Sequence, residues 1–293
     1  MKLRSFLFVP GDSERKAEKA AATSADALIL DLEDAVIPER LDFARNLVRE
    51  FLQSKPDRKV QQLWVRVNPV STPLALADLA AVMPGAPDGI LLPKADSAAD
   101  AVTLDHYLSA LEAREGLPAG STRIVPVATE TAQAMFALNS YAGASSRLAG
   151  LTWGAEDLSS AVGASTNRLQ NGEYEFTYRL ARSLCLLGAA AAGVPAIDTI
   201  WSNFRDLEGL RADAMAARRA GFFGKIAIHP DQIESINAAF TPDADEIAFA
   251  QRVVEAFSGA SGAGAVQIDG KMLDRPHLKQ AQHLLHLAAQ FTS

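Results

Sequence analysis

The sequence is poor in cysteine, in net positive charge and in long apolar runs, and each shortage excludes a class of protein. Its one cysteine, Cys185, permits no intrachain disulfide, and its apolar neighbours indicate a buried helix position. The formal net charge of -7 and the isoelectric point of about 5.3 disfavour nucleic-acid binding. The longest apolar tract, 184–197, contains Gly and Pro and is too short to span a bilayer. The first apolar stretch ends at Pro10-Gly11 without a cleavage site, so we expect a cytoplasmic protein with no membrane or nucleic-acid partner.

The chain also lacks a Gly-rich phosphate loop after its first apolar run, where "PGDSER" stands instead. This absence disfavours a doubly wound sheet, which is the rival fold. Short, nearly continuous apolar runs alternate with amphipathic helical patterns, which is typical of parallel strands buried on both faces. The runs lie at 5–9, 27–32, 63–67, 89–93, 123–128, 148–153, 196–201 and 225–230. This alternation predicts an α/β fold, a (β/α)8 TIM barrel.

The chain continues beyond the last expected strand. Two helical segments are followed by a Gly/Ala/Ser-rich linker at 258–266, a short extended piece and a final helix. We therefore expect two domains, a catalytic barrel at 1–235 and a C-terminal helical extension or lid at 236–293.

Ionisable residues gather at the carboxyl ends of the expected strands, where a barrel of this kind builds its active site. A barrel selected for stability alone would not place its charges so unevenly. The residues are Asp31, Glu33, Asp34, Arg66, Asn68, Lys94, Glu130, Glu156, Asp157, Asp198 and His229.

Glu130 and Asp157 follow neighbouring strands and are expected to converge. Two close carboxylates repel each other unless a cation lies between them, and Mg2+ prefers such oxygen ligands. Glu156 and Asp157 are not both expected to be ligands, because neighbours in an extended chain face opposite ways. The alternative for each carboxylate is a helix cap or a salt bridge.

Arg66 lies within an apolar run and needs an anion. Its planar donor fork suits a substrate carboxylate or an enolate oxygen. The alternative is a buried ion pair with a nearby acid. We interpret His229 as a structural histidine, and Trp153 and Trp201 as barrel packing.

Several segments together resemble the citrate lyase beta-subunit / malyl-CoA lyase family of the HpcH/HpaI aldolase superfamily. They follow the family's order over nearly the whole chain. The segments are "RSFLFVPGDSERKAEKA", "DALILDLEDAV", "VRVNP", "LLPKADS", "ATETAQAM", "WGAEDLSSAVG", "AIDTIWSNFRDLEGL", "GFFGKIAIHPDQI" and "GAVQIDGKMLDRP".

The resemblance implies a (β/α)8 barrel in which Glu130 and Asp157 bind Mg2+. It implies that Arg66, together with Glu130, binds the 2-oxo or 2-hydroxy acid portion of the substrate. It further implies that Arg15 and Lys19 help to bind CoA.

Asp274 in "MLDRP" is implied as an acid or base that reaches a neighbouring subunit's site, hence a homo-oligomer, a trimer or a hexamer. Citrate lyase beta subunits of the family tend to lack this tail, so its presence favours a stand-alone CoA-ester lyase. One departure is Asp96, where the family more often has Glu.

The activity so implied is Mg2+-dependent, retro-Claisen cleavage of a 3-hydroxyacyl-CoA thioester, malyl-CoA or citramalyl-CoA, to acetyl-CoA and a small 2-oxo acid. A thioesterase step is a possible addition. Two alternatives remain open. One is a metal aldolase that needs no CoA, and the other is a carrier-protein-dependent lyase subunit without activity alone.

Overall fold

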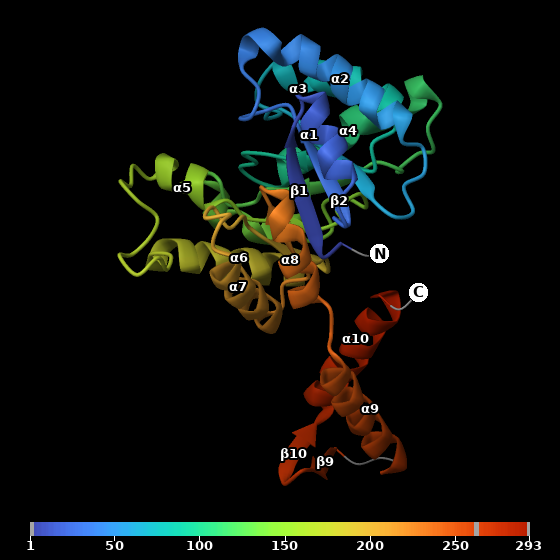
Figure 1. Ribbon diagram of the computed structural model, residues 1–293, viewed down its shortest axis with the longest axis vertical. Coiled ribbons are helices and arrows are strands. Elements are labelled where there is room, and N and C mark those ends of the chain that lie inside the picture. The colour runs from blue at the N-terminus through green and yellow to red at the C-terminus, as the bar shows by residue number, and fades with distance from the viewer. Residues whose placement is uncertain (1–2, 261–263, 292–293) are drawn as a thin grey trace. The chain divides into compact units, whose positions relative to one another are not determined.

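A computed structural model describes residues 3–260 and 264–291 of the chain (Figure 1). The chain divides into two compact units, Leu3–Asn237 and the segment that begins at Ala238. No described helix combines the length and the apolar character that crossing a membrane requires.

The first unit contains eight parallel strands that alternate with helices, as the sequence predicts. The strands are β1 (Ser5–Pro10), β2 (Ala27–Asp31), β3 (Gln62–Arg66), β4 (Gly89–Leu92), β5 (Arg123–Pro126), β6 (Leu151–Thr152), β7 (Ala196–Asp198) and β8 (Gly224–Ala227). Their order is β5-β4-β3-β2-β1-β8-β7-β6, and parallel bridges from Ile124 to Leu148 and from Val127 to Thr152 bring the two end strands together. The predicted (β/α)8 barrel is confirmed.

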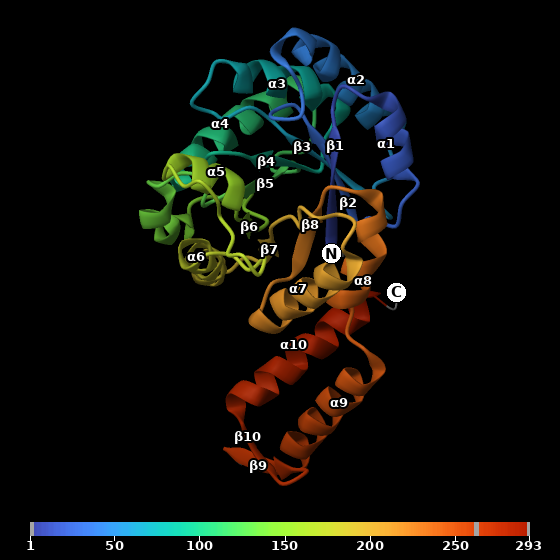
Figure 2. The ribbon, with the colours of Figure 1, turned by 60° about the vertical axis from the view of Figure 1, so that its left-hand side comes forward.

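Helices surround this barrel in Figure 2. The α-helices are α1 (Glu14–Ala21), α2 (Leu41–Ser54), α3 (Leu74–Val82), α4 (Ala98–Glu115), α5 (Ala155–Ala161), α6 (Phe176–Ala192), α7 (Leu207–Ala220) and α8 (Ile233–Phe240). The 3-10 turns are η1 (Pro38–Arg40), η2 (Met83–Gly85), η3 (Ala134–Phe136), η4 (Leu138–Tyr141) and η5 (Pro230–Gln232). Between β5 and β6, where every residue is described, η3 and η4 stand in place of an α-helix.

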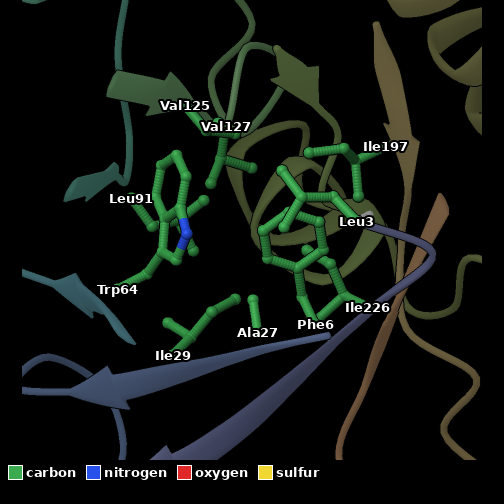
Figure 3. Packing of buried hydrophobic residues seen from close by; sticks show 10 residues of the cluster. All are labelled: Leu3, Phe6, Ala27, Ile29, Trp64, Leu91, Val125, Val127, Ile197 and Ile226. Atoms are coloured by element: carbon green, nitrogen blue, oxygen red, sulfur yellow. The ribbon is translucent and has the colours of Figure 1, made fainter. Parts of the chain in front are cut away.

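The barrel interior is filled by apolar side chains from its strands (Figure 3). The rings of Phe6 and Trp64 meet edge to face, with centroids 5.9 Å apart. Gly89 makes room for this pair, because a Cβ there would lie 2.3 Å from the Trp64 ring. The interior is therefore a packed core, and a ligand can bind only at an end of the barrel.

The second unit pairs two helices with a hairpin. Its elements are α9 (Ala244–Gly259), the antiparallel strands β9 (Ala265–Ile268) and β10 (Lys271–Asp274), and α10 (Arg275–Phe291). Phe257 and Leu273 belong to its own apolar cluster. The predicted linker at 258–266 is too long, because α9 runs to Gly259 and β9 begins at Ala265; residues 261–263 lie outside the described residues.

Candidate active site

A cavity of about 360 Å³ lies at the carboxyl ends of the barrel strands. Five of its lining residues are acidic, and its inner wall is apolar. The acids are Asp31, Asp34, Glu130, Glu156 and Asp157, and the apolar residues include Phe8, Leu91, Val127, Ile200 and Ile226. Most of the strand-end residues predicted from the sequence thus meet in one place.

Glu130 follows β5 and is 5% exposed, while Asp157 lies in the first turn of α5 and is half-buried. Burial, followed by the nearby charge of Asp157, raises the pKa of Glu130 to about 8. Gly154 borders the Glu130 carboxylate, since a Cβ at Gly154 would lie 2.9 Å from Oε1. This pair is the one that the sequence predicts to converge.

The expectation that Glu156 and Asp157 face opposite ways is wrong. The chain enters α5 at Ala155, directly after β6, so these residues are helical rather than extended. Both line the cavity. Strand β6 ends at Thr152, before the end of the apolar run at 148–153. The alternation of side chains in an extended chain therefore does not apply to Glu156 and Asp157.

Lys94 is a site residue to which the sequence reasoning assigned no role. Its backbone N–H donates to Glu130 Oε2 at 2.6 Å, and its Nζ lies 3.3 Å from Asp157 Oδ1. Nζ also donates to Glu33 Oε1. The available signal was a lysine just after an apolar strand, at the end where the acids gather.

Arg66 ends β3 and is already paired with acids. Its Nε and Nη2 donate to the two carboxylate oxygens of Asp31, each at 2.7 Å, and Nη1 lies 3.0 Å from Glu33 Oε2. Although burial opposes the charge, the hydrogen bonds to Asp31 raise the pKa of Arg66 above its ordinary value. The structure therefore contains the buried ion pair that was the alternative interpretation of Arg66. Arg66 also lines the cavity, and some of its five N–H groups are left for a ligand.

Asp198 is not part of this site, contrary to its place among the strand-end acids. It is fully buried and accepts hydrogen bonds from Lys225 at 2.7 Å, Arg182 at 2.7 Å and Trp153 Nε1 at 2.8 Å. A short strand end can direct its side chain away from the barrel axis as well as toward it. Trp153 is buried as expected, whereas Trp201 is half-buried and lines a separate cavity.

His229 and Asn68 make local contacts. The His229 ring stacks on Phe204 with centroids 4.9 Å apart, and its Nδ1 accepts from the backbone N–H of Asp231. Asn68 donates to the Leu32 carbonyl at 3.0 Å.

A second cavity, also of about 360 Å³, adjoins the first. Phe8 and Ile228 line both cavities. Arg15 and Lys19 share one face of α1 and line this second cavity, together with Lys16. The two cavities therefore form a cationic chamber next to an acidic one.

Asp274 belongs to the second unit. It ends β10 directly before α10, and its carboxylate oxygen lies 2.5 Å from Nδ1 of His277. Its backbone N–H donates to the same ring nitrogen at 3.2 Å. The contact with His277 was not foreseen from the sequence.

Whether these residues suit a divalent cation can be tested on the site itself. The described residues contain no cluster of three or more acidic, histidine or cysteine ligands. Mg2+ does not need one, because it is often held by one or two carboxylates and completed by substrate and water. Burial and the nearby charge of Asp157 disfavour the ionised form of Glu130 unless a cation lies beside it. The donor set fits Mg2+.

The sequence profile of the HpcH/HpaI aldolase/citrate lyase family matches residues 4–230. The chain belongs to this family. It is 36% identical over 291 residues to the citrate lyase subunit beta of Haemophilus influenzae, and the match covers 98% of each chain. It is 38% identical over 286 residues to a (3S)-malyl-CoA thioesterase of Cereibacter sphaeroides, covering 96% of this chain and 93% of the relative.

The fold is also similar to that of CitE from Mycobacterium tuberculosis in complex with magnesium, acetoacetate and coenzyme A. The TM-score is 0.80 at 34% identity, and the alignment covers 98% of each chain. The chain is thus an enzyme of the citrate lyase beta-subunit-like type, a lyase.

One expectation from the sequence is overturned by these relatives. The tail does not distinguish a stand-alone enzyme, because the match to the Haemophilus citrate lyase subunit beta runs through it.

Proposed function

We propose that the protein is a Mg2+-dependent lyase that cleaves a 3-hydroxyacyl-CoA thioester, malyl-CoA or citramalyl-CoA, to acetyl-CoA and a 2-oxo acid. The observation that carries this proposal is the facing pair Glu130 and Asp157 in a cavity that adjoins the cationic cavity of Arg15 and Lys19. The complex of the Mycobacterium relative with magnesium, acetoacetate and coenzyme A supports it.

Each part of the site has a task in this chemistry. Glu130 and Asp157 hold Mg2+, which when bound supplies a Lewis acid for the oxygens of the oxo acid. The unused N–H groups of Arg66 stabilise charge that develops on the same portion of the substrate. The apolar wall excludes water from the enolate that forms.

Cleavage requires a base for the substrate hydroxyl. When that proton is removed, the C2–C3 bond breaks, the hydroxyl carbon becomes the 2-oxo carbon, and the electron pair passes to the acetyl-CoA enolate. Protonation of the enolate completes the reaction. We assign the acid or base to Asp274, whose contact with the His277 ring gives it a partner for proton exchange.

The charges around the first cavity favour an oxo acid with a single carboxylate. Arg66 is the only cationic side chain among the residues that line it, and much of its fork is taken by Asp31. Glyoxylate and pyruvate each carry one carboxylate. A citryl substrate yields oxaloacetate, whose second carboxylate would lie among acids and apolar groups.

A coupled assay with malyl-CoA, citramalyl-CoA and citryl-CoA, with and without Mg2+, tests the proposal. We expect cleavage of one or both of the first two, and none in excess EDTA. Glu130→Ala and Asp157→Ala should each abolish the activity while circular dichroism remains that of the wild type. Full activity in EDTA would contradict the proposal.

The two alternatives give different results in the same assay. Cleavage of free hydroxy-oxo acids without CoA would identify a metal aldolase. Activity on citryl esters only when an acyl-carrier partner is added would identify a carrier-dependent subunit.

Charge reversal tests the role of the second cavity. Arg15→Glu together with Lys19→Glu should raise the KM for the CoA ester more than the KM for the oxo acid in the condensation direction. Lys55→Glu with Lys59→Glu is a matched control, because these residues are also four apart, and they lie outside both cavities. Equal effects of the two double variants would count against phosphate binding by Arg15 and Lys19.

Subunit mixing tests the assignment of Asp274. We propose a homo-oligomer, a trimer or hexamer, in which Asp274 serves a neighbouring site. A mixture of Asp274→Ala and Arg66→Ala chains should then regain part of the activity, since some mixed sites carry neither defect. Absence of recovery, with exchange shown by labelled subunits, would exclude action in trans.

A further inference from the structure

Lys94 adopts a backbone conformation that is uncommon for a residue with a side chain. Its φ is +51°, and only Ala86 and Asp269 share a positive φ among the described residues other than glycine. This left-handed conformation costs about 1–2 kcal/mol relative to the right-handed one. Lys94 lies directly after Pro93, where β4 has ended and the chain enters the site.

This conformation lets one residue contact both predicted metal ligands through different atoms. The backbone N–H of Lys94 donates to Glu130 Oε2 at 2.6 Å, while the side chain turns so that Nζ lies 3.3 Å from Asp157 Oδ1. Nζ is also paired with Glu33 and lies 3.4 Å from Asp34. A single ammonium group thus faces three carboxylates.

The Lys94 side chain is partly open to solvent. It is 31% exposed, and Asp157 and Asp34 are 32% and 57% exposed, so solvent reaches the ammonium group. A lysine ammonium is a compact charge on a flexible four-carbon stem, unlike the rigid fork of Arg66. The Arg66 guanidinium is fixed by hydrogen bonds to both carboxylate oxygens of Asp31, whereas an incoming cation can displace the Lys94 ammonium.

We propose that the Lys94 ammonium is a built-in counter-ion that takes the place of the divalent cation beside Asp157 until the metal binds. The inference rests on the proposed function, because it takes Glu130 and Asp157 as the metal ligands. It makes Lys94 a positioning residue that offsets the repulsion among these carboxylates in the metal-free protein. The same positive charge opposes the metal and weakens its binding to the free protein.

Direct binding of Mn2+ to the full-length protein, followed by electron paramagnetic resonance, tests this proposal without any substrate. Lys94→Met removes the charge and keeps the length of the side chain. We expect it to bind Mn2+ about tenfold more tightly, the order expected for one unit charge acting on a divalent ion through water-like screening. A residue with a merely structural role would give weaker binding on removal.

Lys94→Gly guards against loss of the fold, because glycine adopts a positive φ without strain and keeps the N–H that Glu130 accepts. It should also bind Mn2+ about tenfold more tightly. Ala86→Gly is the matched control: φ is +49° there, the same strain is relieved, and Mn2+ affinity should be unchanged.

The outcomes separate this inference from the proposed function. Suppose that the wild type binds Mn2+ and that Glu130→Gln does not. Unchanged or weaker Mn2+ binding by both Lys94 variants would then overturn the role of Lys94 and leave the metal site intact. If neither the wild type nor the two Lys94 variants bind Mn2+, the proposed metal site is wrong, and the proposed role of Lys94 is wrong with it.

Discussion

Glu130→Gln should stabilise the metal-free protein at neutral pH although it destroys the metal site. The variant keeps the shape of the side chain and an oxygen for the Lys94 N–H, but it cannot ionise. In the wild type, burial and the charge of Asp157 raise the pKa of Glu130 from 4.5 to about 8. At pH values between 4.5 and about 8, Glu130 is therefore protonated in the folded protein and ionised in the unfolded chain.

The sign and size of the effect follow from linkage. Because the folded pKa is raised, the contribution of Glu130 to stability is fully present below pH 4.5 and is lost as the pH rises toward 8. At pH 7 the interval is about 2.5 pH units, which at about 1.4 kcal/mol per unit lowers the free energy of unfolding by about 3 kcal/mol. Glutamine avoids this loss, so the melting temperature should rise by roughly 5–10 °C.

Thermal unfolding in EDTA from pH 4.5 to 8 measures this effect. The wild type should lose stability along the series relative to Glu130→Gln, and the two curves should converge at the acidic end. Added Mg2+ should raise the melting temperature of the wild type but not that of Glu130→Gln. Glu156→Gln is the control, since Glu156 lines the same cavity but is exposed. A Glu130→Gln protein less stable than the wild type at pH 7 would refute the reasoning.

Four further predictions concern the same barrel. Binding of Mg2+ at pH 7 should release close to one proton from Glu130. Calorimetry in buffers of different ionisation enthalpy detects this proton, and a binding heat that does not depend on the buffer would contradict the prediction. Gly154→Ala should weaken Mn2+ binding at least tenfold by displacing the Glu130 carboxylate, and unaltered affinity would show that the site relaxes without cost. Arg66→Lys keeps the charge but loses the fork, so kcat/KM should fall by orders of magnitude, and unchanged kinetics would leave it a structural ion pair. Lys225→Met should destabilise the protein by about 3 kcal/mol in chemical denaturation because Asp198 loses a buried partner, and a neutral result would show that its other partners suffice.

The positions of several site residues could be predicted from the sequence because these residues lie at the ends of strands. Parallel strands in a barrel bring their carboxyl ends to one rim, so Glu130 and Arg66 were predictable once the strands were recognised. The pairing of Arg66 with Asp31 was foreseen only as an alternative. The roles of Arg15, Lys19 and Asp274 came from the family resemblance and stay predictions.

Other features depended on where a strand stops and how the chain turns next. The apolar run at 148–153 gave no sign that α5 begins at Ala155, so Asp157 was expected on a strand and lies on a helix. Asp198 ends a strand as expected, yet it faces Lys225 and takes no part in the cavity.

The sequence by itself determined the barrel and the acidic rim, because apolar periodicity and strand ends are local properties of the chain. Only the tertiary structure decided which acid faces which cation. The left-handed backbone of Lys94 and the absence of a Cβ at Gly154 set the positions of the carboxylates, and both act on residues more than twenty positions away. Close packing fixes such contacts through space, and no pattern along the chain records them.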